Sequence, residues 1–407
     1  MPWVEPWFLA YACLGIVQGG MLPVLLPLSA GGSAYAGVIV GLMNLAGLTA
    51  PFWGHLADRR QLHRQMLLAG LLIALLALLL IPMESGIALK ATLACMLGLG
   101  FAAANTVANM FIVEVHPPEE WDARIGALQA LCGIGQVTGL LLAGLLGGRY
   151  ALAFGVAAAF IAAALPIASL TLRSIHIEVP RAAATAHPPA GAEGWAGAPQ
   201  RLFHVPTLSG LATLVRELDM PFAHLQIVWF VAFVAISAVL TMFPLAMVEN
   251  FAVAPGLPAT TYAFASAISL GVYPVAAILA RQYGEHRILR AGFLIRASAM
   301  ALLGTAFFLA DGAFIAPIGA GILILAWPLL GVSGTALSAQ LAPRDEGEAL
   351  GLFNASTSLA GAVGAFLGGW AMQKVGYGTL CLIGSVVVAL AAASSMGLRR
   401  RRLLPSG

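Results

Sequence analysis

Long apolar runs separated by short polar breaks extend over almost the whole chain. Most runs are about twenty residues long, and polar and apolar positions show little alternation within them. A run of this length spans the hydrocarbon core of a bilayer as an α-helix, whereas a membrane β-strand would alternate. The pattern therefore predicts an all-α integral membrane protein.

The runs predict about twelve transmembrane helices, six on each side of a polar middle segment. In the first half they cover residues 5–28, 34–54, 64–82, 88–115, 122–146 and 150–172. In the second half they cover residues 222–247, 260–280, 288–310, 312–337, 347–372 and 377–396. The first run lacks the cleavage site of a signal peptide, so we expect it to be retained.

These runs divide the chain into two expected bundles, residues 1–173 and 222–398, followed by a basic tail at 399–407. Residues 174–221 are rich in Pro, Gly, Ala and His, which is typical of a linker. Leucines at helical spacing near residues 208–215 predict either a short amphipathic helix at the membrane surface or a solvated turn.

An internal repeat relates the two halves. Residues 117–144 align without a gap with residues 342–369, about half a chain later. The alignment places Gly on Gly and Pro on Pro at several positions, and it pairs Gln129 with Asn354. Such a duplication within apolar sequence is typical of transporters built from two similar bundles.

Composition excludes most other classes. The 407 residues are 60% hydrophobic and 9% charged, with a mean hydropathy of +0.92, which exceeds what a soluble core can bury. The net charge of +3 is small and dispersed, so we expect no nucleic-acid partner. The four cysteines stand singly within apolar runs, which indicates core packing and no metal site, and no cofactor is expected.

Loop charge predicts the orientation. Roughly sixteen of the twenty Lys and Arg residues fall at one end of the predicted helices. Under the positive-inside rule this end is cytoplasmic, so both termini and the linker should lie in the cytoplasm. The expected location is a bacterial inner membrane.

The loop after the second run carries a recognisable motif, residues 54–60 with the sequence GHLADRR. It resembles the signature loop of the major facilitator superfamily, G-x-L-A-D-R-x-G-R-K, and departs from it at Gln61 and Leu62. The resemblance implies two pseudo-symmetric six-helix bundles, alternating access and a monomer. It also implies that Gly54, Asp58 and Arg59 form a conformational latch at the start of the eleventh span; a plain loop ion pair is the simpler interpretation.

The equivalent loop of the second half has Arg281 where the first has Asp58. By symmetry, its partner should lie among the acids that begin the fifth span, such as Asp122. We therefore expect a charge-inverted latch between Arg281 and Asp122, with exposed loop charges of negligible energy as the alternative.

The fifth span is similar to the glycine-rich motif of exporters in the superfamily, through Gly126, Gly135, Gly139 and Gly144. Leu140 replaces the proline of that motif, and in the fourth span Ala94 replaces the arginine of proton-coupled exporters. Close helix packing explains the glycines equally well. The resemblance is nearest to small drug and sugar efflux proteins, while these departures weaken the assignment of proton antiport.

Few ionisable residues lie at membrane depth, where they are costly and usually functional. Glu114 and Arg296 are the candidates for proton coupling. An interfacial cap at Glu114 is the simpler interpretation, and Arg296 is expected to extend its charge toward the cytoplasm.

Neutral polar residues in the spans that line the transport path of the family form the candidate substrate cavity. Asn105 and Asn109 share a helix face, and Gln129 and Asn354 are expected to face each other across the pseudo-twofold axis. The candidates are Gln18, Asn44, Asn105, Asn109, Gln129, Gln136, Thr241, Tyr262, Tyr273, Trp327 and Asn354.

These features predict a secondary active transporter that moves a small neutral or amphipathic organic solute by alternating access, through proton-linked efflux. A facilitator or importer of a neutral metabolite is the alternative. Met21, Met43, Met110, Met242 and Met247 also allow a Cu(I) importer. An enzyme is not expected, because no His, Asp and Glu group converges at membrane depth, and a scaffold or receptor would be expected to carry a large soluble tail.

Overall fold

The computed structural model describes residues 4–50, 52, 53, 56, 63–84, 86–116, 118–172, 220–342 and 346–397. In this part of the chain the secondary structure is helical, without strands. Eleven helices are long and apolar enough to cross a membrane, and a further apolar helix, Ser33–Thr49, is shorter. The prediction of an all-α membrane protein with about twelve spans is confirmed.

The described residues of the first half form six helical spans, several of them assembled from shorter helices. Their elements are α1 (Phe8–Leu14), η1 (Gly15–Met21), α2 (Leu22–Leu28), α3 (Ser33–Ala46), η2 (Gly47–Thr49), α5 (His63–Leu80), η3 (Ile81–Met83), α6 (Ile87–Val115), α7 (Pro118–Leu145) and α8 (Tyr150–Thr171). The first span is continuous from α1 to α2, but its middle section η1 is a π-helix, which the apolar pattern does not predict.

The second half repeats this arrangement. Its elements are α10 (Met220–Phe251), α11 (Gly256–Tyr283), α12 (Glu285–Ala306), α13 (Gly312–Leu325), α14 (Trp327–Gln340), α15 (Glu346–Val375), α16 (Tyr377–Ser394) and η6 (Ser395–Gly397). The tenth predicted span is interrupted at Ala326, because Pro328 lacks the amide hydrogen that would continue the helix. Helix α10 begins two residues earlier than predicted, while predicted linker residues 174–219 lie outside the described residues.

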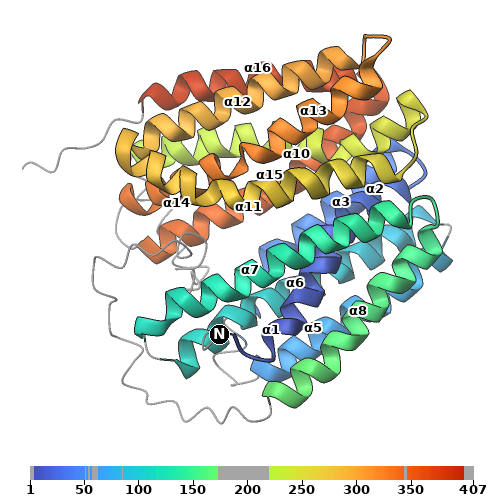
Figure 1. The fold of residues 1–407 in the computed structure, drawn as a ribbon, viewed down its shortest axis with the longest axis vertical. Coiled ribbons are helices and arrows are strands. Elements are labelled where there is room, and N and C mark those ends of the chain that lie inside the picture. The colour runs from blue at the N-terminus through green and yellow to red at the C-terminus, as the bar shows by residue number, and fades with distance from the viewer. Residues whose placement is uncertain are drawn as a thin grey trace, which may run out of the picture.

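Two helical bundles, one from each half, lie side by side (Figure 1). Because successive spans run antiparallel, the chain starts at the same end where α8 ends, α10 starts and α16 ends; we call this the linker end. The opposite end, at Ala30, Gly148, Ala252 and Gly376, is the far end. The bundles contact each other through α3 against α15 and through α7 against α11. They spread apart toward the linker end (Figure 1).

Small residues allow the bundles to touch at the far end. A Cβ atom added to Gly37 of α3 would lie 2.6 Å from the carbonyl oxygen of Ala365 on α15. A Cβ atom on Gly256 of α11 would lie 2.5 Å from the carbonyl oxygen of Gly144 on α7. Side chains larger than hydrogen would therefore separate the helices, so glycine closes the far end.

Candidate functional site: a cavity between the bundles

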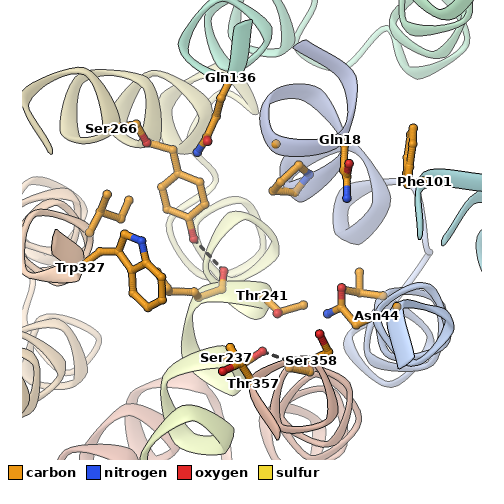
Figure 2. Close-up of a pocket in the computed structure, with 18 of the residues that line it drawn as sticks. Gln18, Asn44, Phe101, Gln136, Ser237, Thr241, Ser266, Trp327, Thr357 and Ser358 are labelled. Carbon is orange, nitrogen blue, oxygen red and sulfur yellow. Dashed lines mark hydrogen bonds between the residues drawn. The ribbon is translucent and has the colours of Figure 1, made fainter. Parts of the chain in front are cut away.

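A cavity of about 760 Å³ lies between the two bundles, within the usual size range of small-molecule sites. Residues of η1, α3, α6 and α7 line it from the first bundle, and residues of α10, α11, α14 and α15 line it from the second. Figure 2 shows labelled side chains from both bundles pointing into this common space. The cavity therefore lies at the interface that must rearrange if the bundles move.

The first bundle contributes amide side chains. Gln18, Asn44, Asn105 and Gln136 all line the cavity, and Asn105 Nδ2 donates a hydrogen bond of 2.8 Å to Gln18 Oε1. Amides offer both donors and acceptors without charge, so this wall suits uncharged polar groups.

The π-helix η1 positions Gln18, which lies in its middle. Its glycines pack directly on α7: a Cβ atom on Gly20 would lie 2.6 Å from the Cα of Gly139, and one on Gly139 would overlap the Ile16 carbonyl. The π-helical turn is thus held against a neighbouring backbone beside the cavity, a location where such turns frequently serve function.

The second bundle contributes hydroxyl groups. Ser237 Oγ donates to the Gly361 carbonyl at 3.0 Å, and Tyr262 donates to the Leu240 carbonyl at 2.6 Å. Thr357 Oγ1 donates to the Phe353 carbonyl at 2.8 Å and accepts a hydrogen bond of 2.8 Å from Trp229 Nε1. These donors are used within the protein, so the hydroxyl oxygens offer mainly acceptors to a ligand.

An aromatic cluster adjoins these hydroxyls. The rings of Trp229 and Phe233 stack at a centroid distance of 4.6 Å, and Phe233 meets Trp327 edge to face at 5.4 Å. Phe353 packs on Trp229 at 4.4 Å. Because Phe233 and Trp327 line the cavity, this cluster gives one wall a flat apolar surface.

Arg296 of α12 also lines the cavity, contrary to expectation. It is 2% exposed, so its charge does not extend to the membrane surface as the sequence suggested. The guanidinium carbon lies 5.4 Å from the ring centroid of Trp327. Beside the predicted neutral polar side chains, the cavity wall therefore includes one buried cation.

The structure brings most of the sequence-predicted cavity residues together. The predicted residues that line the cavity are Gln18, Asn44, Asn105, Gln136, Thr241, Tyr262, Tyr273 and Trp327. Gln129 and Asn354 lie outside the lining: Gln129 is exposed, and Asn354 Nδ2 donates to the Leu350 carbonyl of its own helix at 3.1 Å. Asn109 lies in α6, but its side chain is outside the described residues.

Sequence reasoning missed lining residues of two kinds. Ser237, Thr357 and Ser358 are common in transmembrane helices and give a weak signal, although Ser237 and Phe233 lie one and two turns before Thr241 on α10. Arg296 was predicted as a candidate for proton coupling but not as a lining residue, because its span was not expected to reach the transport path.

The latch and proton-coupling residues are placed only in part. Gly54, Asp58 and Arg59 lie outside the described residues, and Asp122 and Glu114 lie in α7 and α6 with side chains that are not described. Arg281 is exposed in the last turn of α11, at the linker end.

Metal-binding chemistry finds little support in the described residues. They contain no group of three or more His, Cys, Asp and Glu residues able to hold a metal ion. Met21, Met242 and Met247 are fully buried core residues, whereas Met43 lines the cavity; the side chain of Met110 is not described. Core packing accounts for the three buried thioethers.

Comparison with known proteins identifies the family. The family model of the Major Facilitator Superfamily matches residues 7–333. The chain belongs to this superfamily. No curated protein sequence matches it.

Solved structures of the superfamily share the fold over almost the whole chain. A nucleoside transporter, NupG, matches with a TM-score of 0.74 and 13% identity, covering 97% of each chain. A peptide transporter of the POT family in an autoinhibited form matches with a TM-score of 0.75 and 16% identity, covering 97% of this chain and 96% of that one. A D-xylose-proton symporter matches with a TM-score of 0.71 and 16% identity, with the same coverage. At these identities the similarity shows the fold alone.

Proposed function

We propose that this member of the superfamily is a secondary transporter that carries a small amphipathic organic solute by alternating access. The observation that carries the proposal is the cavity of about 760 Å³ between the bundles, with amides on one wall and hydroxyls and aromatic rings on the other. A solute with polar groups and an apolar body complements both walls. The structural neighbours are transporters of nucleosides, of peptides and of a sugar, which supports a small organic solute.

Within the proposed transport cycle, we assign the conformation described here to the inward-open state. Glycine contacts close the far end, and the bundles spread toward the linker end. The linker end also carries most of the basic loop residues, which indicates the cytoplasmic side. Solute would then exchange with the cytoplasm in this state.

The outward-open state would close the linker end. We propose that Asp58, with Gly54 and Arg59, then latches onto the start of α15, and that Arg281 pairs with Asp122. Arg281→Asp and Asp122→Arg should each reduce transport, and the double swap should restore it. Single variants without effect, or a double variant without rescue, would remove the Arg281 latch from the mechanism.

For direction and coupling we propose proton-linked efflux, with Glu114 as the proton carrier. The glycine spacing of α7 supports efflux, and the place of Glu114 in the last turn of α6, at the linker end, gives it access to protons from that side. A facilitator is the second candidate, because no carboxylate occurs among the described cavity-lining residues.

Counterflow in proteoliposomes tests the central proposal, since it reports transport whatever the coupling. Liposomes preloaded with one unlabelled solute would be offered the same labelled solute, for a nucleoside, a dipeptide, D-xylose and an aromatic acid in turn. Accumulation of any member above protein-free liposomes supports a transporter. Absence of counterflow for a wide solute panel, with folded protein, would contradict it.

An imposed pH gradient separates the two coupling candidates. Proton-linked transport should be driven by the gradient in the wild type, and Glu114→Gln should abolish this drive while retaining counterflow. Glu249→Gln is the matched control, because Glu249 is exposed near the end of α10. Insensitivity of the wild type to the gradient favours the facilitator.

A further inference from the structure

Arg296 lies deep in the membrane-spanning part of the second bundle. Helix α12 begins at Glu285 at the linker end, and the eleven residues to Arg296 correspond to about 16 Å of helix, near the middle of a hydrocarbon core of about 30 Å. The side chain is 2% exposed. A charge at this depth is costly and needs compensation.

The described residues provide the guanidinium of Arg296 with neither a counter-charge nor a full set of hydrogen-bond acceptors. In the described part of the chain no Asp or Glu oxygen lies within 4.0 Å of Arg296, and Arg296 Nε is buried without a hydrogen-bond acceptor. The acids of the second bundle that lie among the described residues stand near helix ends: Glu249, Glu285, Asp311, Glu346 and Glu348.

The contacts that Arg296 does make leave its donors free for a ligand. The guanidinium carbon of Arg296 lies 5.4 Å from the ring centroid of Trp327. A cation–π contact offsets part of the cost, but it uses none of the five N–H donors of a guanidinium. Because Arg296 lines the cavity, a molecule that enters it can approach the guanidinium, of which Nε is buried and the whole side chain is 2% exposed.

We infer that the transported solute is an organic anion, and that its carboxylate or other anionic group pairs with Arg296. A planar guanidinium binds a carboxylate through two parallel hydrogen bonds, which supplies both the missing acceptor and the missing counter-charge. The inference rests on the proposed transport function and narrows its solute class from amphipathic to anionic.

The surroundings of Arg296 describe the rest of this solute. Trp327 is shared between the cation and the aromatic cluster, since its ring also meets Phe233 at 5.4 Å. An aromatic or flat apolar body attached to the anionic group would stack on this surface. Arg296 is the one Lys or Arg among the described lining residues, so a single negative charge is the best match.

Paired ligands that differ in charge test the inference. Benzoate with benzamide, and indole-3-acetate with indole-3-acetamide, keep ring and size while removing the anion. We would measure thermal stabilisation of the purified protein and counterflow in proteoliposomes, using wild type, Arg296→Gln, Arg296→Lys and Arg287→Gln. Arg287 is the matched control, because it lies on α12 but is exposed at the linker end.

The expected result is stabilisation by the acids and not by the amides. Arg296→Gln should weaken acid binding on the order of tenfold to a hundredfold, Arg296→Lys should weaken it less, and Arg287→Gln should leave it unchanged. Because Arg296 has no carboxylate partner among the described residues, Arg296→Gln should melt at or above the wild-type temperature without ligand. A structural arginine would give the opposite shift.

Three outcomes would overturn the inference. Equal binding of acids and amides, or retained acid binding in Arg296→Gln, would show that the solute is not recognised as an anion. The proposal that the protein transports a neutral solute would still stand. A folded wild type that transports nucleoside, dipeptide or D-xylose but binds no acid does the same. Absence of counterflow for every solute contradicts the proposed function itself.

Discussion

Gly37 of α3 and Gly369 of α15 lie in backbone contact across the two bundles at the far end. A Cβ atom on Gly369 would be 2.8 Å from the Cα of Gly37, and one on Gly37 would be 3.1 Å from the Cα of Gly369. Real Cβ atoms do not approach backbone this closely without displacement, so the contact requires hydrogen at both positions. Helices α3 and α15 can meet here only in the state closed at the far end.

Substitution of Gly37 by valine should therefore shift the conformational equilibrium toward a state open at the far end. Each bundle keeps its own packing, so the melting temperature should change little, whereas counterflow should fall on the order of tenfold. Ser33→Cys, in a background without the four native cysteines, reports on this end because Ser33 is 7% exposed. Its labelling by a membrane-impermeant maleimide should become faster.

Gly321→Val serves as the control, since a Cβ atom there would meet nothing within 4 Å. It should leave both counterflow and Ser33→Cys labelling unchanged. Lost transport in Gly37→Val without faster labelling would contradict a gate at this contact.

Gly139 makes an equally close contact, but within one bundle. A Cβ atom on it would overlap the carbonyl oxygen of Ile16, so Gly139→Ala must displace α7 from η1. We expect destabilisation of about 1–3 kcal/mol, seen as a lower melting temperature with or without ligand. Gly155→Ala on α8, where a Cβ atom meets open space, should melt as the wild type does. Equal melting temperatures for both variants would show that the bundle absorbs the added methyl group.

The fold could be predicted largely from the sequence, because bilayer thickness dictates the length of the apolar runs and the repeat relates the two halves. Local irregularities within the helices were harder to predict. The π-helix at Gly15–Met21 depends on close packing of η1 against α7, a tertiary contact that the apolar pattern does not encode. The break at Ala326 could have been anticipated from Pro328.

The candidate site was predicted in part, for a physical reason. Amides such as Gln18 and Gln136 stand out in apolar spans, and the structure places both in the cavity lining. Equivalence in the repeat suggested Gln129 and Asn354 as well, but equivalence does not determine how each helix is rotated about its axis. Arg296 reaches the cavity from α12 through packing beside Trp327 of α14, which the sequence alone does not show.

The hydrogen bond between Asn105 and Gln18 joins α6 to the π-helix and should matter for ligand binding. Gln18→Ala removes the acceptor of the 2.8 Å bond and leaves the Asn105 amide unpaired at the cavity wall. We expect solute affinity to fall on the order of tenfold, with a small change in melting temperature. Because the two residues act as a pair, the double variant with Asn105→Ala should lose little more than either single variant.

Gln340→Ala is the matched control for this experiment. Its side chain donates at 3.0 Å to Glu285 Oε1 on the exposed linker end, away from the cavity. Additive losses from Gln18→Ala and Asn105→Ala would show that the residues contact the solute independently.

Glu5 ties the start of the chain to the corner between α6 and α7. Its Oε1 accepts from Arg124 at 2.6 Å and lies 2.6 Å from His116 Nε2, and its Oε2 accepts from Trp7 Nε1 at 2.7 Å. The side chains of Glu5 and Arg124 are 19% and 12% exposed, so solvent screens this network less than a surface ion pair. Arg124 also holds Glu120 on its own helix, at 2.8 Å.

Glu5→Gln should therefore destabilise the first bundle by about 1–3 kcal/mol, because charge-assisted hydrogen bonds contribute more than neutral ones. The network lies at the linker end, away from the cavity lining, so counterflow per folded molecule should stay close to that of the wild type. Melting temperature measured at low and high salt provides the readout, with Glu249→Gln as an exposed control. An unchanged melting temperature at low salt would show that these ion pairs contribute negligible energy. The first helix would then be held mainly by Trp7, Phe8 and Tyr11, which are buried in the core.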